Sequence, residues 1–171
     1  MPTQIPCLWY DREAEPAAQH YIAIFPNSEI VSVSRYGPDR PEREREVMTV
    51  EFSLDGQRYV ALNGGPDFPF TEAVSFQIHC ADQAEVDHYW SRLTEGGQPG
   101  PCGWLKDRFG VSWQVVPLRL FELVGDPDPG RSQRATRAML KMNRIVIAEL
   151  ERAADAVPAA EDAPPRSPAA S

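Results

Sequence analysis

The sequence predicts an α+β fold built from two βαβββ modules and followed by a C-terminal helical extension. Three observations support this prediction: several segments alternate apolar and polar residues with the period of a β-strand, amphipathic helical segments lie between them, and the strand–helix order occurs twice. The expected boundaries are residues 3–70 for the first module, 71–117 for the second, 118–153 for the C-terminal helices and 154–171 for a disordered tail.

An internal repeat defines the two modules. A strand over Ile5–Tyr10 precedes a helix over Glu13–Phe25, and a strand over Val74–Cys80 precedes a helix over Gln83–Glu95. Each helix is followed by further strand and hairpin segments, which are Glu29–Tyr36, Val47–Leu54, Arg58–Asn63, Gly103–Asp107 and Val111–Val116. Two βαβββ modules are the simplest account of this order.

The alternation also predicts that each sheet has one dry face and one polar face. The helices are expected to cover the dry face, to which we assign Met48, Val50, Phe52, Leu54, Val74, Phe76, Ile78, Cys80, Val111, Trp113 and Val115. The polar faces carry neutral groups more than charges. We interpret them as the lining of a cavity, and a simply solvated sheet face is the alternative.

Local signals mark the starts of two helices and the end of the folded chain. Asp82 followed by Glu85 has the spacing of a capping box, and Asp128 before Pro129 predicts the start of an amphipathic helix over residues 129–153. The Ala/Pro-rich residues from Ala154 onward lack apolar periodicity, so we expect them to be disordered.

Composition excludes several classes of function. The 171 residues carry a formal net charge of −8, which disfavours nucleic acid and anionic membrane surfaces as partners. Three cysteines do not form a disulfide framework and suit a reducing compartment. Neither a basic leader nor an apolar run of membrane-spanning length is expected, so we predict a cytoplasmic protein.

The motifs in the second half resemble a known family. They comprise Trp90, Leu93, Gly97, Gly100–Asp107 and Phe109–Pro117, with Ile5-Pro6, Trp9-Tyr10, Phe25–Ser28 and Ala61–Pro66 in the first half. Over about residues 3–150 the chain is similar to the PhnB-like group of the vicinal oxygen chelate superfamily, which includes glyoxalase I, extradiol dioxygenases and bleomycin-resistance proteins. The domain of this group carries the name 3-demethylubiquinone-9 3-methyltransferase. The resemblance implies a cupped glyoxalase-like barrel and a homodimer.

The resemblance also implies where a divalent metal would be bound. Superfamily enzymes take His or Glu ligands from the first and last strands of both modules, which here correspond to Pro6 or Cys7, Val60 or Ala61, Ser75, and Gln114. Apolar and neutral side chains are poor ligands for such ions, so we expect neither this metal site nor another cofactor. An unconventional site made by His79, Glu51 and Gln114 is the alternative.

The methyltransferase name receives no support from the glycine motifs. An S-adenosylmethionine domain needs a glycine-rich turn between a strand and the following helix. Gly64-Gly65-Pro66 and the segment 96–100 are instead interpreted as turns.

We therefore predict a metal-free dimer that binds a small molecule in the sheet cavity, and we assign no catalytic residue. The expected ligand-binding residues are Glu51, Asn63, Ser75, Gln77, His79, Cys102, Trp104 and Gln114, with Trp104 as the wall that would stack on a flat ligand. A metal-dependent lyase, isomerase or dioxygenase is the first alternative, and whether the protein is an enzyme stays open. A partner-binding helix over residues 130–153 and a true methyltransferase are the weaker alternatives.

Overall fold

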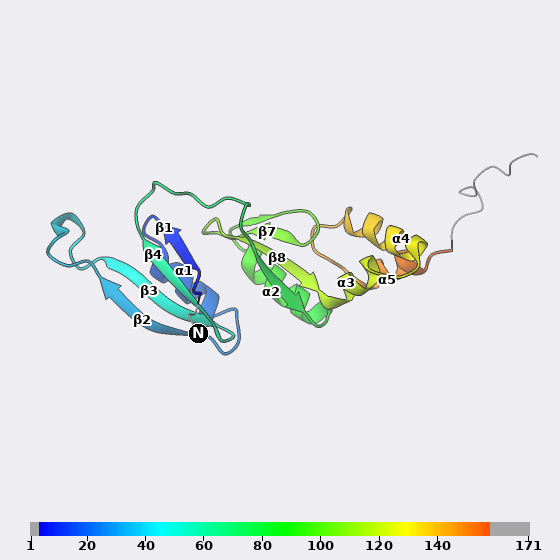
Figure 1. The fold of residues 1–171 in the computed structure, drawn as a ribbon, viewed down its shortest axis with the longest axis horizontal. Helices are drawn as coiled ribbons and strands as arrows, with labels where there is room; N and C mark the ends of the chain where they lie inside the picture. The colour runs from blue at the N-terminus through cyan, green and yellow to red at the C-terminus, as the bar shows by residue number, and fades with distance from the viewer. Residues whose placement is uncertain (1–3, 158–171) are drawn as a thin grey trace, which may run out of the picture.

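The computed structural model of the chain describes residues 4–157. It contains two four-stranded mixed sheets and a C-terminal helical extension, arranged in a row along the long axis of the molecule (Figure 1). The predicted α+β fold with two repeated modules is confirmed, because both sheets have the same strand order. Neither sheet closes into a barrel by itself, and two open sheets are consistent with the expected cupped arrangement.

Each module forms one sheet covered by one helix. The first sheet contains, in spatial order, β1 (Cys7–Tyr10), β4 (Gln57–Asn63), β3 (Val47–Leu54) and β2 (Glu29–Arg35). The second contains β5 (Phe76–Cys80), β8 (Ser112–Pro117), β7 (Trp104–Lys106) and the short β6 (Gln98–Pro99). The covering helices are α1 (Ala14–Ile22) and α2 (Gln83–Thr94), and a 3-10 turn, η1 (Pro41–Arg43), precedes β3. In both sheets the first and last strands of the module are parallel neighbours, and the other pairs are antiparallel.

Most residues of the predicted dry faces belong to one core that runs through both modules. The assignment of Val74 to the dry face is wrong, because this residue lies in a bend before β5 and is 69% exposed. Val50, Phe52, Cys80 and Val115 are fully buried, and Trp113 is nearly so. The alternation slips at the start of β3, where Val47 rather than Met48 is buried. The reason is a register irregularity in the β2–β3 ladder, which skips one residue at this point.

A buried carboxylate joins the two modules. Asp107, directly after β7, is 3% exposed and accepts hydrogen bonds from the Tyr21 hydroxyl of α1 at 2.7 Å and from the Trp113 indole at 2.9 Å. Its other oxygen accepts the backbone N–H groups of Phe109 and Val111 at 2.9 and 3.0 Å. Burial of this cluster raises the pKa of Tyr21 well above its ordinary value, so the phenol stays a donor to the carboxylate.

The extension consists of α3 (Leu118–Val124), α4 (Pro129–Met139) and α5 (Ile147–Asp155). A single helix over residues 129–153 was expected, and this prediction is wrong because the chain turns between α4 and α5. The Met142 and Asn143 carbonyls accept hydrogen bonds from the backbone N–H groups of Cys102 and Gly103, both at 2.7 Å. Because these two carbonyls accept hydrogen bonds from the second module, they do not accept the bonds that would continue α4 into α5 as one helix.

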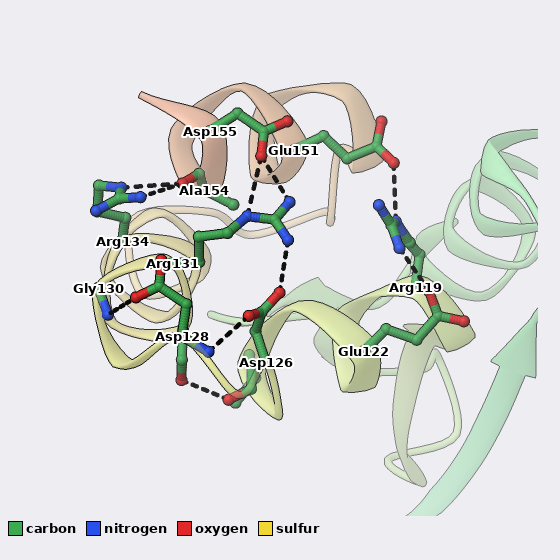
Figure 2. A network of polar contacts seen from close by, with 12 residues as sticks. Arg119, Glu122, Asp126, Asp128, Gly130, Arg131, Arg134, Glu151, Ala154 and Asp155 are labelled. Carbon is green, nitrogen blue, oxygen red and sulfur yellow. Dashed lines mark hydrogen bonds and ion pairs between the residues drawn. The ribbon is translucent and has the colours of Figure 1, made fainter. Parts of the chain in front are cut away.

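Ion pairs, drawn in Figure 2, hold the three helices of the extension together, and apolar packing adds to them. Arg131 of α4 binds Asp126 before it and Asp155 at the end of α5, with both distances 2.6 Å. Ile145, Leu150 and Ala154 are fully buried in the apolar cluster of the extension. The predicted tail starts at Ala154, but Ala154 and Asp155 belong to α5. The rest of the predicted tail, from residue 158 on, lies outside the described residues.

Among the helices of residues 4–157, none combines the length and apolar character that crossing a membrane would require.

Candidate functional site

The open face of the second sheet carries a chain of neutral hydrogen-bonding side chains. Gln114 of β8 donates to the Ser75 hydroxyl at 2.7 Å, and Gln77 of β5 donates to the Gln114 amide oxygen at 3.1 Å. The His79 ring lies 3.2 Å from the Gln77 amide oxygen. The strand period places Ser75, Gln77 and His79 on one face, and the parallel register places Gln77 beside Gln114. Four predicted site residues therefore lie together.

A groove of about 310 Å³ adjoins this chain. Its lining comprises Glu72, Gln98, Pro99, Gly100, Pro101, Trp104, Leu105, Lys106 and Ser112. Trp104 of β7 is half-buried and lines the groove, and it is the neighbour of Gln114 in the antiparallel register. Its role as the wall that stacks on a flat ligand stays a prediction.

The charges at the groove compensate each other. The Lys106 ammonium lies 2.5 Å from a Glu72 carboxylate oxygen. The hydrogen bond from Lys106 lowers the pKa of Glu72, which keeps the carboxylate ionised. The groove consequently offers aromatic, hydroxyl and amide groups to a ligand but no unpaired charge from these two residues.

Ser112 is a site residue that the sequence analysis did not select. It is 2% exposed, and its hydroxyl has no hydrogen-bond partner among the described residues. Ser112 also lines an adjacent apolar groove of about 290 Å³, which includes Trp9, Phe68 and Val74. Burying a hydroxyl without a hydrogen-bond partner lowers the free energy of unfolding by about 1–3 kcal/mol. The available signal was its alternation with Gln114, which places both residues on the open face of β8.

The remaining predicted site residues lie elsewhere. Glu51 is on the first sheet, where it forms an ion pair with Arg58. Asn63 is buried, and its amide bonds two backbone groups, the Ala14 N–H at 2.8 Å and the Val47 carbonyl at 3.0 Å. It thereby holds the start of α1.

Cys102 also stands apart from the amide chain. It occupies a turn before β7 with a left-handed backbone conformation, φ 56°, and its N–H contacts the extension. The thiol of another cysteine, Cys80, is buried on the dry face, and burial raises its pKa to about 12.

The residues at the superfamily's metal positions do not fit a divalent ion. Cys7 lies beside Val60 on the first sheet, and Gln114 donates a hydrogen bond to Ser75 on the second, so these positions supply one thiol, one apolar side chain, one hydroxyl and one neutral amide. Within the described part of the chain, no group of three or more His, Cys, Asp or Glu side chains converges. His79 instead packs its ring against Phe121 of α3, with 5.3 Å between centroids.

Comparison with known proteins gives the family. The family model described as 3-demethylubiquinone-9 3-methyltransferase matches residues 2–116, which is most of the chain. The chain belongs to this PhnB-like family. It is 31% identical to the PhnB protein from Bacillus cereus, with a TM-score of 0.61, and the match covers 68% of this chain and 99% of that one. A protein from Pseudomonas aeruginosa, PA1353, shares the fold at 20% identity and a TM-score of 0.55, covering 68% of this chain and 98% of that one. No curated protein shows a significant match.

The PhnB-like family places the chain in the vicinal oxygen chelate superfamily, as its sequence motifs predicted. The glycine pairs do not favour the methyltransferase in the family name. Gly64 and Gly65 follow β4 and lead into the connection between the modules, and Gly96 and Gly97 follow α2. Neither glycine pair therefore lies between a strand and a following helix, where a nucleotide-type cofactor would need it.

Proposed function

We propose that this PhnB-like protein binds a small, flat and largely neutral molecule in the groove on the open face of the second sheet. The unpartnered Ser112 hydroxyl is the observation that carries the proposal, because a bound carbonyl or hydroxyl group would supply the missing hydrogen bond. Trp104 provides a stacking surface, and the amides of Gln98 in the lining and of Gln114 beside Trp104 in the sheet register would provide donors and acceptors. Catalysis is not part of the proposal.

The proposal includes a homodimer and a cytoplasmic location. Phe68 and Val74, which lie beside the grooves, are 64% and 69% exposed, and a second copy packed against the open faces would cover them. Cys7, Cys80 and Cys102 are free thiols, which suits a reducing compartment. Sedimentation of the purified protein tests the dimer independently of the ligand.

Native mass spectrometry of protein purified without chelator or affinity metal is the first test. An organic adduct of constant mass on a dimer would support the binding function. A stoichiometric metal increment that disappears in His79→Ala would contradict it and favour the metal-dependent lyase, isomerase or dioxygenase.

Calorimetric titration with 2-naphthol, a flat neutral probe, then locates the site. Trp104→Ala and Gln114→Ala are expected to weaken binding by about tenfold each, the effect of losing one good contact. Glu51→Gln is the matched control, because Glu51 lies on the open face of the other sheet and is paired with Arg58. Equal affinities in all four proteins would reject this groove.

A further inference from the structure

The extension contains a further and larger groove, between α4 and α5. Its volume is about 530 Å³, compared with about 310 Å³ for the groove on the second sheet. Four cationic side chains line it, Arg134, Arg137, Lys141 and Arg152, together with the single acid Glu149 and a floor that includes Met142. The family match ends before this extension begins.

The cationic lining of this groove contrasts with the negative net charge of the whole chain. The protein has a formal net charge of −8, yet the segment 129–148 contains five basic residues and no acidic one. Arg134, Arg137 and Lys141 follow one another at spacings of three and four residues, so they share one side of α4 and the turn after it. Like charges at such spacing repel one another, and a bound anion would remove that repulsion.

The other arginines of the extension are already neutralised, as Figure 2 shows for two of them. Arg119 binds Glu122 and Glu151, Arg131 binds Asp126 and Asp155, and Arg144 binds Asp87. By contrast, no carboxylate within residues 4–157 lies at ion-pair distance from Arg137, Lys141 or Arg152.

Arg134 fixes the geometry of the groove. Its Nε and Nη2 atoms donate to the Ala154 carbonyl near the end of α5, at 2.9 and 2.6 Å (Figure 2). This contact links the two helices and holds the guanidinium in the wall of the groove. The cations are therefore presented by a packed helical pair whose inner residues, Ala135 and Leu150, are fully buried.

We propose that this groove binds a small organic anion that carries two negative charges on oxyanion groups, as a phosphate ester or a dicarboxylate does. Arginine forks pair with either group through two parallel hydrogen bonds, and Lys141 adds a point charge. The floor containing Met142 and Ala153 would contact the carbon skeleton of the ligand. This site is separate from the neutral groove on the second sheet, and the proposal does not depend on that groove.

Calorimetric titration of the full chain at low ionic strength tests the proposal, with glycerol 3-phosphate as the phosphate-ester probe and glutarate as the dicarboxylate probe. We expect saturable binding of at least one probe, and the tighter probe identifies the headgroup. The double variant Arg137→Gln/Arg152→Gln should lose at least tenfold in affinity. Both side chains are exposed and make no ion pair among the described residues, so the fold should be retained.

Arg92→Gln is the matched control, because it removes a positive charge from an exposed position on α2 outside the groove. It should bind the probes as the unchanged protein does, and Trp104→Ala should also leave anion affinity unaltered. Absence of saturable binding for both probes would overturn the proposal. Equal affinity in the double variant and the unchanged protein would overturn it as well, since it would show general charge attraction.

Discussion

In the first module the start of α1 is held by Asn63, which reaches the Ala14 N–H from the far end of β4. In the second module the start of α2 is held by Asp82, the residue directly before it, which accepts the Glu85 N–H at 2.9 Å. Glu85 in turn accepts the Ala81 N–H at 2.7 Å. Two modules with one strand order therefore satisfy a backbone N–H in the first turn of their helix by a long-range contact in one case and a local motif in the other.

The open faces of the two sheets differ as well. The first carries the Glu51–Arg58 ion pair beside apolar residues such as Val60 and Leu62, whereas the second carries the amide chain and the neutral groove. The equivalent core positions of the two modules are both apolar, since Ala17 of α1 and Val86 of α2 are fully buried under their sheets. Repetition of the core thus preserves the fold, while the open face of each sheet is free to differ.

The largest effect is expected where the modules meet. Asp107→Ala would leave the Tyr21 hydroxyl, the Trp113 indole and two backbone N–H groups without an acceptor in a buried place. We expect the free energy of unfolding to fall by about 3–5 kcal/mol, measured by urea denaturation. A loss below that of Asn63→Ala would contradict the view that Asp107 is the principal polar link between the modules.

Truncation of equivalent core residues should affect both modules alike. The offset that aligns Ala17 with Val86 also aligns Ile24, just after α1, with Leu93 of α2, and these are 4% and 0% exposed. Ile24→Ala and Leu93→Ala should each lower the free energy of unfolding by about 2–5 kcal/mol. Urea unfolding curves with two transitions, of which each variant shifts only one, would instead show that the modules unfold separately.

The two helix starts should differ in their sensitivity. Asn63→Ala removes two hydrogen bonds from a buried place and should lower the free energy of unfolding by about 1–3 kcal/mol. Asp82→Ala removes an exposed cap and should lower it by about 1 kcal/mol. Thermal unfolding of the two variants gives the order, and the reverse order would show that the local cap of α2 matters more.

The smallest effect concerns His20 on α1. Burial and the nearby Arg108 lower its pKa, and its Nε2 atom is buried without a partner among the described residues. The unfolded chain takes up the proton near pH 6.5, before the folded protein does, so stability should fall as the pH drops below about 6.5. His20→Gln should flatten this part of the profile in urea unfolding at pH 5 to 8, and an unchanged slope would assign the pH dependence to other groups.

Sequence alone determined the features that depend on near neighbours. The alternation in β3, β5 and β8 identified most of the dry faces, and Asp82 with Glu85 identified the start of α2. The same alternation placed Ser75, Gln77 and His79 together on one polar face. These predictions succeed because a strand repeats every two residues and a capping box spans four, so the relevant groups are close along the chain.

Tertiary structure decided the features that depend on distant residues. Asn63 was predicted to contact a ligand, but the sheet register places its amide against Ala14 and Val47. Asp107 joins the modules because folding brings Tyr21 to it from 86 positions away. The turn between α4 and α5 follows from the backbone bonds to Cys102 and Gly103. Spacing cannot reveal such contacts, because each requires two elements to pack before the polar groups meet.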